Sequence, residues 1–251
     1  MGKKNRKKKI LFLVEGPSDK NALEVVIPKL YASVDPDISV DFPTKIEDGR
    51  EGGDITTRYG ITPSNIEGCL NKLFIGPYLQ NNYLYPRDIA QIIQIVDTDG
   101  IYIPDEMIHE DTACTDKILY REDGIWAASA KNVMIRNLRK MGNLNHLVRM
   151  ENIKVGSRLI RYSVFYFSCN LDHYLHSDAN LSPQLKCQMA RDFSTLSSEN
   201  MDHFLQKILT DPDAALNMSY KESWDFIKEG GNSLKRHTNI NILLQRILTG
   251  R

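Results

Sequence analysis

LFLVEGPSDKNAL at residues 11–23 and IIQIVDTDG at residues 92–100 are the two stretches that decide the fold of this chain. Each opens with a short, nearly continuous apolar run, which is typical of a strand buried on both faces of a parallel sheet. Each run ends at an acid, Glu15 or Asp97, and a helical pattern that Ser18 can cap follows the first. Because parallel strands need crossover connections, these stretches predict an α/β fold.

The rest of the chain completes this pattern. Further strands are predicted at residues 38–42 and 161–167, and helices at 19–32, 64–76 and 127–138. Pro28 should kink the first of these helices or end it early. Residues 45–60 are rich in glycine and charge and predict a mobile loop, whereas residues 101–125 give no assignable pattern. The last part of the chain predicts helices at residues 183–193, 199–209, 219–228 and 238–248.

We therefore predict an open, mostly parallel sheet with helices on both faces and a C-terminal helical region. The predicted organisation is a basic flexible tail at residues 1–9, an α/β core at 10–178 and a helical region at 179–251 packed on the core. In open sheets of this kind the functional site lies at the carboxyl ends of the strands. Both acidic motifs lie at such ends.

Composition limits the class of protein. The chain has 251 residues, of which 41% are hydrophobic and 25% charged, with a formal net charge of zero. Its four cysteines form no CxxC pair, which argues against a structural zinc site or a disulfide framework. No apolar stretch approaches the length of a membrane span, so a cytoplasmic protein is expected.

The positive charge is concentrated at the N-terminus, where residues 3–9 are KKNRKKK. This run is a solubilising tail, an electrostatic arm for a phosphate backbone, or an artificial extension, and we favour the tail. If nucleic acid is the partner, the candidate contacts are Lys7, Lys8, Arg50, Arg58 and Arg236.

Three acids form the candidate active site. Asp97 and Asp99 are two residues apart, so in an extended strand both carboxylates would point the same way, and Glu15 ends what we expect to be a neighbouring strand. Carboxylates this close repel one another unless a cation neutralises them, and an all-oxygen ligand set favours Mg²⁺ or Mn²⁺. Asp19 is either a further metal ligand or only a complement to the helix dipole. Ordinary turn chemistry explains each motif alone, but their joint occurrence is more specific.

Together the two quoted stretches resemble the Toprim signature, in which a glutamate ends the first strand and a DxD ends a later one. The resemblance covers about 22 residues in the motifs, and the order of elements agrees over roughly the first 100 residues. It implies that Glu15, Asp97 and Asp99 bind magnesium and promote the making or breaking of phosphodiester bonds. It also matches Asp19 to the extra acid of the nuclease branches, such as the OLD-family nucleases.

A second segment, FYFSCNLDHYLHSD at residues 165–178, resembles the SNPxFExWLL segment of small stand-alone Toprim-like proteins of the RloB and abortive-infection group. Leu171 replaces the proline of that pattern and Asp172 is its acid. A buried aromatic strand followed by a turn explains the same letters, and we favour that interpretation.

The expected function is a magnesium-dependent nuclease, in phage defence or RNA processing. The chain has no GxxxxGK[ST] motif, so any ATPase would be a separate partner subunit. Lys235 is the candidate for the cation that offsets charge at the scissile phosphate, although a solvated helix face is the explanation we favour for it. The alternatives are a nucleic-acid-binding or toxin-like subunit that needs a partner, and a small phosphoester hydrolase.

Overall fold

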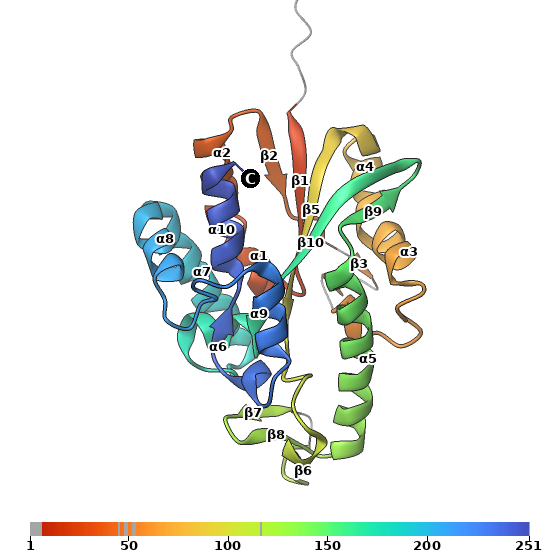
Figure 1. Cartoon of the computed structure of the whole chain (residues 1–251), viewed down its shortest axis with the longest axis vertical. Coiled ribbons are helices and arrows are strands. Elements are labelled where there is room, and N and C mark those ends of the chain that lie inside the picture. The colour runs from red at the N-terminus through yellow and green to blue at the C-terminus, as the bar shows by residue number, and fades with distance from the viewer. Residues whose placement is uncertain (1–6, 45, 48–49, 52–53, 116, 251) are drawn as a thin grey trace, which may run out of the picture.

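A six-stranded, mostly parallel sheet forms the centre of the molecule (Figure 1). The computed structural model describes residues 7–44, 46–47, 50–51, 54–115 and 117–250. The sheet has the order β11-β10-β5-β1-β2, and β9 pairs with the outer edge of β10. Its strands are β1 (Lys8–Leu13), β2 (Ile38–Asp41), β5 (Ile89–Asp97), β9 (Asn152–Val155), β10 (Arg158–Ser168) and β11 (His237–Thr238). β2, β1, β5 and β10 run parallel to one another, whereas β9 and β11 are antiparallel to β10.

Helices cover both faces of this sheet, so the predicted α/β architecture with a mostly parallel sheet is confirmed. One face carries α1 (Pro17–Leu23), α2 (Val26–Val34), α6 (Leu171–His176), α7 (Pro183–Glu199), α8 (Met201–Leu209) and α10 (Ile240–Thr249). The other carries α3 (Ile66–Leu70), the π-helical turn η2 (Asn71–Ile75), α4 (Gly76–Asn81), α5 (Ala130–Arg149) and α9 (Tyr220–Ile227). Short 3₁₀ turns are η1 (Ile55–Thr57), η3 (Pro86–Asp88), η4 (Asp105–Met107) and η5 (Asn232–Leu234).

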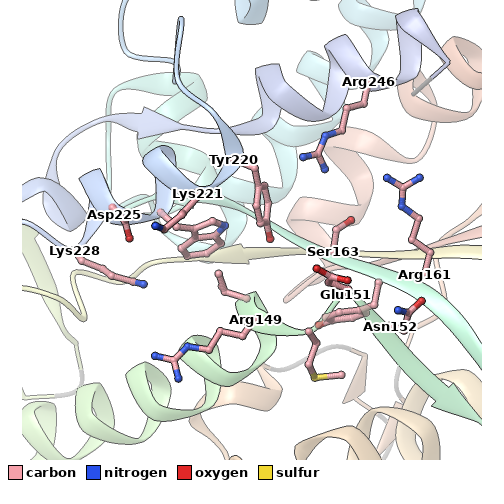
Figure 2. A pocket seen from close by; sticks show the side chains of 14 residues that line it. Arg149, Glu151, Asn152, Arg161, Ser163, Tyr220, Lys221, Asp225, Lys228 and Arg246 are labelled. Atoms are coloured by element: carbon pink, nitrogen blue, oxygen red, sulfur yellow. The ribbon is translucent and has the colours of Figure 1, made fainter.

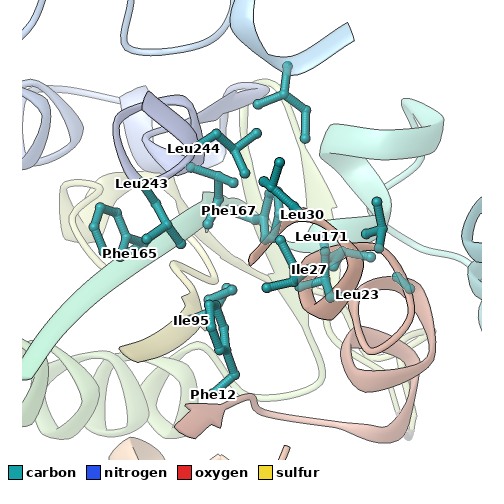
Figure 3. Packing of buried hydrophobic residues seen from close by; sticks show 14 of the residues in the cluster. Phe12, Leu23, Ile27, Leu30, Ile95, Phe165, Phe167, Leu171, Leu243 and Leu244 are labelled. Carbon is teal, nitrogen blue, oxygen red and sulfur yellow. The ribbon is translucent and has the colours of Figure 1, made fainter. Parts of the chain in front are cut away.

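The core follows from the alternation of side chains along the strands. In β1, Phe12 faces the α1/α2 side, whereas Leu11 and Leu13 face the α3/α5 side. Figure 3 shows Phe12 and Ile95 of the sheet beneath helical residues of the first face, including Leu30. Because both faces are covered, the central strands are mostly apolar, and each fully buried apolar side chain contributes about 1.5–3 kcal/mol.

Two smaller sheets lie outside the central one. β3 (Ile46–Glu47) and β4 (Arg50–Glu51) pair as a two-stranded antiparallel sheet within the segment predicted to be a loop. β6 (Ile108–Glu110), β8 (Gly124–Ala127) and β7 (Leu119–Arg121) form a three-stranded sheet from the region that gave no pattern. This second sheet lies beyond the carboxyl end of the central strands (Figure 1).

Several element boundaries differ from the sequence-based expectation. The break in the first helix falls at Glu24 and Val25 rather than at Pro28, because Pro28 occupies the first turn of α2, where no backbone N–H is needed. β1 begins at Lys8, inside the predicted tail. The helix expected at residues 127–138 extends as α5 to Arg149. The C-terminal region is not purely helical, since β11 pairs with Phe167 and Ser168 of the central sheet.

Candidate metal centre

Glu15 and Asp97 meet at the carboxyl edge of the sheet. β1 and β5 are adjacent parallel strands, so their ends lie side by side, as expected. The backbone amide of Asp97 donates a hydrogen bond to Glu15 Oε1 at 3.1 Å. This contact holds the glutamate across the gap between the two strands.

Asp99 lies just beyond the strand, in a different backbone conformation from Asp97. The amides of Thr98 and Asp99 donate to the carbonyl groups of Phe167 and Cys169, which tie the motif to β10. Asp99 then adopts φ 49° and Gly100 φ 65°, so the extended backbone ends here. The prediction that the carboxylates of Asp97 and Asp99 point the same way assumed an extended backbone through Asp99. That assumption was wrong.

Gly100 is required by this turn. A Cβ atom there would lie 2.5 Å from a side-chain carbon of Leu234, and the positive φ disfavours any L side chain. The glycine that follows the DxD therefore allows the sharp turn that places the Asp99 carboxylate.

Asp54 is the third member of the cluster, and the sequence did not indicate it. It precedes η1, and its Oδ1 accepts hydrogen bonds from the amide and hydroxyl of Thr56. Glu15, Asp54 and Asp99 each present a carboxylate oxygen, and these oxygens lie within 4.8 Å of one another. Three segments far apart in sequence thus converge on one acidic triad, in which Asp54 takes the place expected for Asp97.

Lys140 of α5 lies at the centre of the triad. Its Nζ is 3.0 Å from Glu15 Oε1, 2.9 Å from Asp54 Oδ2 and 2.7 Å from Asp99 Oδ2, and its side chain is completely buried. Lys140 shares the buried stripe of α5 with Val133, Asn137, Leu144 and Leu147. The helix therefore directs an ammonium group into the acidic cluster from the α3/α5 side.

A second cation and a phenol surround Asp99. Tyr120 of β7 donates a hydrogen bond from its hydroxyl to Asp99 Oδ1 at 3.1 Å. Arg136, one turn before Lys140 on α5, donates to the Tyr120 hydroxyl at 2.9 Å and to the backbone carbonyl of Asp99 at 3.0 Å. The small sheet and α5 together fix the orientation of this carboxylate.

The electrostatics of the acids differ because their neighbours differ. Burial, with the adjacent Asp54, raises the pKa of Glu15 well above its usual range despite Lys140. Burial, with the charges of Asp19 and Asp99, does the same to the pKa of Asp97. Burial also acts to raise the pKa of Asp99, but Lys140 and Arg136 outweigh it, and the net change is downward. The ionised forms of Glu15 and Asp97 are therefore disfavoured in this site, whereas the ionised form of Asp99 is favoured.

A second acidic group adjoins the triad on the side of α6 and α7. Asp97 Oδ1 accepts a hydrogen bond from the amide of Leu171, the first residue of α6. The next residue, Asp172, is buried and pairs with Lys186 of α7 at 2.6 Å. Asp19 accepts from the amide of Gly16 and caps α1, and burial raises its pKa to about 6. Its contact with the helix start supports the helix-dipole alternative for Asp19.

The donor set fits a hard divalent cation. Asp54 Oδ2 is buried and accepts no hydrogen bond of good geometry, although Lys140 Nζ lies nearby. The two adjoining groups hold six carboxyl groups and three cations: Glu15, Asp19, Asp54, Asp97, Asp99 and Asp172, with Lys140, Arg136 and Lys186. All the ligand atoms are carboxylate oxygens, the type that Mg²⁺ and Mn²⁺ prefer. Glu15, Asp54 and Asp99 could therefore hold a metal ion.

Lys235 and Arg236 lie outside this cluster. No helix begins at these residues, which follow η5 and precede β11. The exposed Lys235 ammonium donates to Asn232 Oδ1, and the cation that contacts the triad is Lys140 instead. Arg236 forms ion pairs with Asp211 and Asp213 and donates to the carbonyl of Tyr174 at 2.9 Å. Its guanidinium is thus engaged within the C-terminal region, which opposes the predicted contact with nucleic acid.

The other predicted contacts to nucleic acid are dispersed. Lys7 and Lys8 lie at the amino end of β1, about 20 Å along the strand from Glu15, and Lys8 Nζ donates to the carbonyl of Arg87. Arg58 follows η1, close in sequence to Asp54. Arg50 lies in β4, and its side chain is outside the described part of the structure.

Comparison of the chain with protein-family models, curated proteins and solved structures gave no significant match. Within the described part of the chain, the helices are all too short or too polar to span a membrane.

Proposed function

We propose that this chain is a magnesium-dependent nuclease with a Toprim-like core. The observation that carries the proposal is the convergence of Glu15, Asp54 and Asp99 at the carboxyl edge of a parallel sheet. That edge is where ligands bind in open α/β sheets, and acids at the ends of adjacent strands are what the Toprim resemblance implies. The position of the triad thus agrees with the motif-based expectation, although Asp54 was not part of it.

The triad would hold the cation, and its neighbours would keep it in place. A bound Mg²⁺ or Mn²⁺ would supply Lewis-acid polarisation of a phosphoryl oxygen and a water of lowered pKa. Glu15 is fixed by the Asp97 amide and Lys140, and Asp99 by Tyr120 and Lys140. These contacts hold the ligands in position before a substrate arrives, which reduces the cost of reorganisation.

Lys140 has two functions in this proposal. It neutralises part of the triad, so that the acids remain close together without a metal, and it leaves a net negative charge that a divalent cation can offset. Burial acts to lower the pKa of Lys140, but Asp54, Asp99 and Glu15 raise it well above its usual range, so the ammonium stays charged. Lys140 therefore replaces Lys235 as the cation of the centre.

Cleavage assays test the proposal directly. Plasmid DNA, single-stranded DNA and structured RNA are incubated with the wild-type protein in Mg²⁺, Mn²⁺ or EDTA, beside Asp99→Asn. We expect metal-dependent cutting that falls about 100-fold or more in the variant, as when a group that stabilises the transition state electrostatically is removed. Asp202→Asn, a similar change at an exposed position on α8, should cut like wild type.

The remaining outcomes separate the alternatives. Equal cutting by wild type and Asp99→Asn would reject the metal centre as the source of activity. Absence of cutting by the wild type would reject an independent nuclease and favour a subunit that needs a partner, such as an ATPase. Cleavage of a small phosphomonoester without cleavage of any polymer would favour the phosphoester hydrolase.

A further inference from the structure

The outer edge of β10 is unpaired along its middle. β9 pairs only with Arg158–Arg161, and β11 pairs only with Phe167 and Ser168. Beside this open stretch, Arg161, Tyr162 and Ser163 of β10 line a groove between the end of α5 and the helices α9 and α10 (Figure 2). The groove encloses a cavity of about 850 Å³, within the range of small-molecule and cofactor sites.

Side chains and a loop carbonyl already occupy the hydrogen-bonding groups of this edge. The amide of Tyr162 donates to the carbonyl of Glu151, and the Tyr220 hydroxyl contacts both the amide and the carbonyl of Val164. The amide of Tyr166 donates to Asn239 Oδ1, and its carbonyl accepts from Thr238. An added peptide strand would find these groups already bonded, so the groove is unsuited to recognition by strand pairing.

The groove is lined instead by cations. Five of its lining side chains are basic and two are acidic: Arg149, Arg161, Lys221, Lys228 and Arg246, with Glu151 and Asp225. In Figure 2, Arg161 and Arg246 lie at one end, and Arg149 and Lys228 lie at the other. Among the described residues, no acid forms an ion pair with any of these four cations. A concave surface with this balance raises the local concentration of anions.

The two ends of the groove each bring like charges together. Arg246 packs over the rings of Tyr220 and Phe165, at 5.1 and 5.6 Å from their centroids, which holds its guanidinium towards the groove. Burial lowers the pKa of Arg246; Tyr220 opposes this change, and the charge of Arg161 adds to it. At the other end, burial lowers the pKa of Lys228; the charge of Asp225 opposes this change, and the charge of Arg149 adds to it. Each pair would be stabilised by an anion between its members.

We propose that this groove binds a ligand with at least two phosphate groups, one at Arg161 and Arg246 and one at Arg149 and Lys228. Guanidinium groups bind phosphate oxygens through paired, charge-assisted hydrogen bonds, which favours phosphate over other anions at both ends. Two sources present this chemistry: a free nucleotide and the backbone of a nucleic-acid strand.

The groove is separate from the metal centre but shares its framework. Arg149 lies nine residues beyond Lys140 on α5, about 14 Å along the helix axis. Binding at the groove requires no metal and no cleavage. It can therefore be tested in EDTA, where failure of the proposed nuclease activity has no influence on the result.

The experiment measures equilibrium binding of three probes in EDTA at low salt: ATP, a fluorescent single-stranded RNA oligonucleotide of about ten nucleotides, and a Glu-rich peptide of matched charge. The proteins are wild type, Arg161→Gln with Arg246→Gln, and Arg149→Gln with Lys228→Gln. A control with Lys131→Gln and Arg191→Gln removes two exposed cations outside the groove. Circular dichroism spectra verify that all variants are folded.

We expect ATP or RNA to bind wild type and control equally, and each groove variant about tenfold more weakly. If RNA is the ligand, the slope of log Kd against log salt concentration should fall by about 0.7 for each phosphate that a variant no longer neutralises. Binding of ATP without binding of RNA would identify the groove as a nucleotide site. The proposal is overturned if neither phosphate probe binds wild type. Equal weakening in the control, or tighter binding of the peptide than of both phosphate probes, would also overturn it.

Discussion

At the scale of single residues, the buried ammonium of Lys140 holds the acidic centre together. Three carboxylate oxygens lie within 3.0 Å of its Nζ, and no other cation contacts Asp54 among the described residues. Without this charge, Glu15, Asp54 and Asp99 would repel one another in a poorly solvated site. The stability of the metal-free protein should therefore depend strongly on Lys140.

Lys140→Met tests this dependence. We expect the variant to lose about 3–5 kcal/mol of unfolding free energy in EDTA, because the triad is left uncompensated. Addition of Mg²⁺ or Mn²⁺ should restore more stability to the variant than to wild type, because the cation then supplies the missing charge. Urea denaturation with and without metal measures both effects.

The matched control is Lys131→Met, at an exposed position near the start of the same helix. It should change stability by less than about 0.5 kcal/mol. If Lys140→Met proved as stable as this control in EDTA, the lysine would not be what holds the acids together.

The residues of the centre differ in how far the sequence reveals them. Glu15, Asp97 and Asp99 could be located because each ends or follows a conspicuous apolar strand. Asp54 could not, because nothing local distinguishes it from other polar loop residues, and tertiary contacts alone bring its loop to the sheet. The sequence indicates Lys140 more weakly, through its helical spacing with the apolar residues Leu144 and Leu147. These residues lie beyond the point where the helix was expected to end.

At the scale of elements, β11 connects the C-terminal region to the central sheet. His237 of this strand is buried, its Nδ1 lies 3.0 Å from the Tyr166 hydroxyl, and its ring packs on Phe226. Burial lowers the pKa of His237 to about 4, although Asp211 and Asp213 oppose the change. The native state therefore keeps this imidazole neutral.

A definite pH dependence follows. An unfolded histidine has a pKa of about 6.5, so protons bind the unfolded chain more readily than the native state as the pH falls from about 6.5 to 4. The free energy of unfolding should therefore fall by about 2 kcal/mol at this site as the pH is lowered from 7 to 5. Urea denaturation of wild type and His237→Gln at both pH values measures the difference.

Comparing the two proteins removes the contribution of other groups. Asp19, with its pKa of about 6, titrates in the same range in both proteins and so cancels. Identical pH profiles for wild type and His237→Gln would show that the native state does not exclude the proton from His237.

The elements themselves were predictable where their periodicity is strong. β1, β5, β10 and the last four helices lie close to their expected positions, because apolar runs and helical stripes specify them. The small sheet of β6, β7 and β8 was missed because its strands are three or four residues long and their pairing is set by tertiary contacts. This missed sheet also supplies Tyr120, which orients Asp99.

At the scale of the whole molecule, the acidic centre and the basic groove lie at different places on one framework. β10 and α5 contribute to both: Phe167 and Lys140 contact the Thr98–Asp99 segment, whereas Ser163 and Arg149 line the groove. The zero net charge of the chain thus conceals a marked separation of charge, with acids at the carboxyl edge of the sheet and cations at the open edge of β10. Such a separation suits a protein that holds a cation at one place and phosphates at another.

The most direct test of the central claim is a calorimetric titration of Mn²⁺ into wild type, Asp54→Asn and Asp202→Asn. Asp54 is the informative position because the structure, rather than the motif, places it in the triad, and asparagine can still accept the hydrogen bonds from Thr56. We predict saturable binding to wild type and to the exposed control Asp202→Asn, and at least about tenfold weaker binding to Asp54→Asn. Absence of saturable binding to wild type, or equal affinity for Asp54→Asn, would contradict the assignment of a metal centre to Glu15, Asp54 and Asp99.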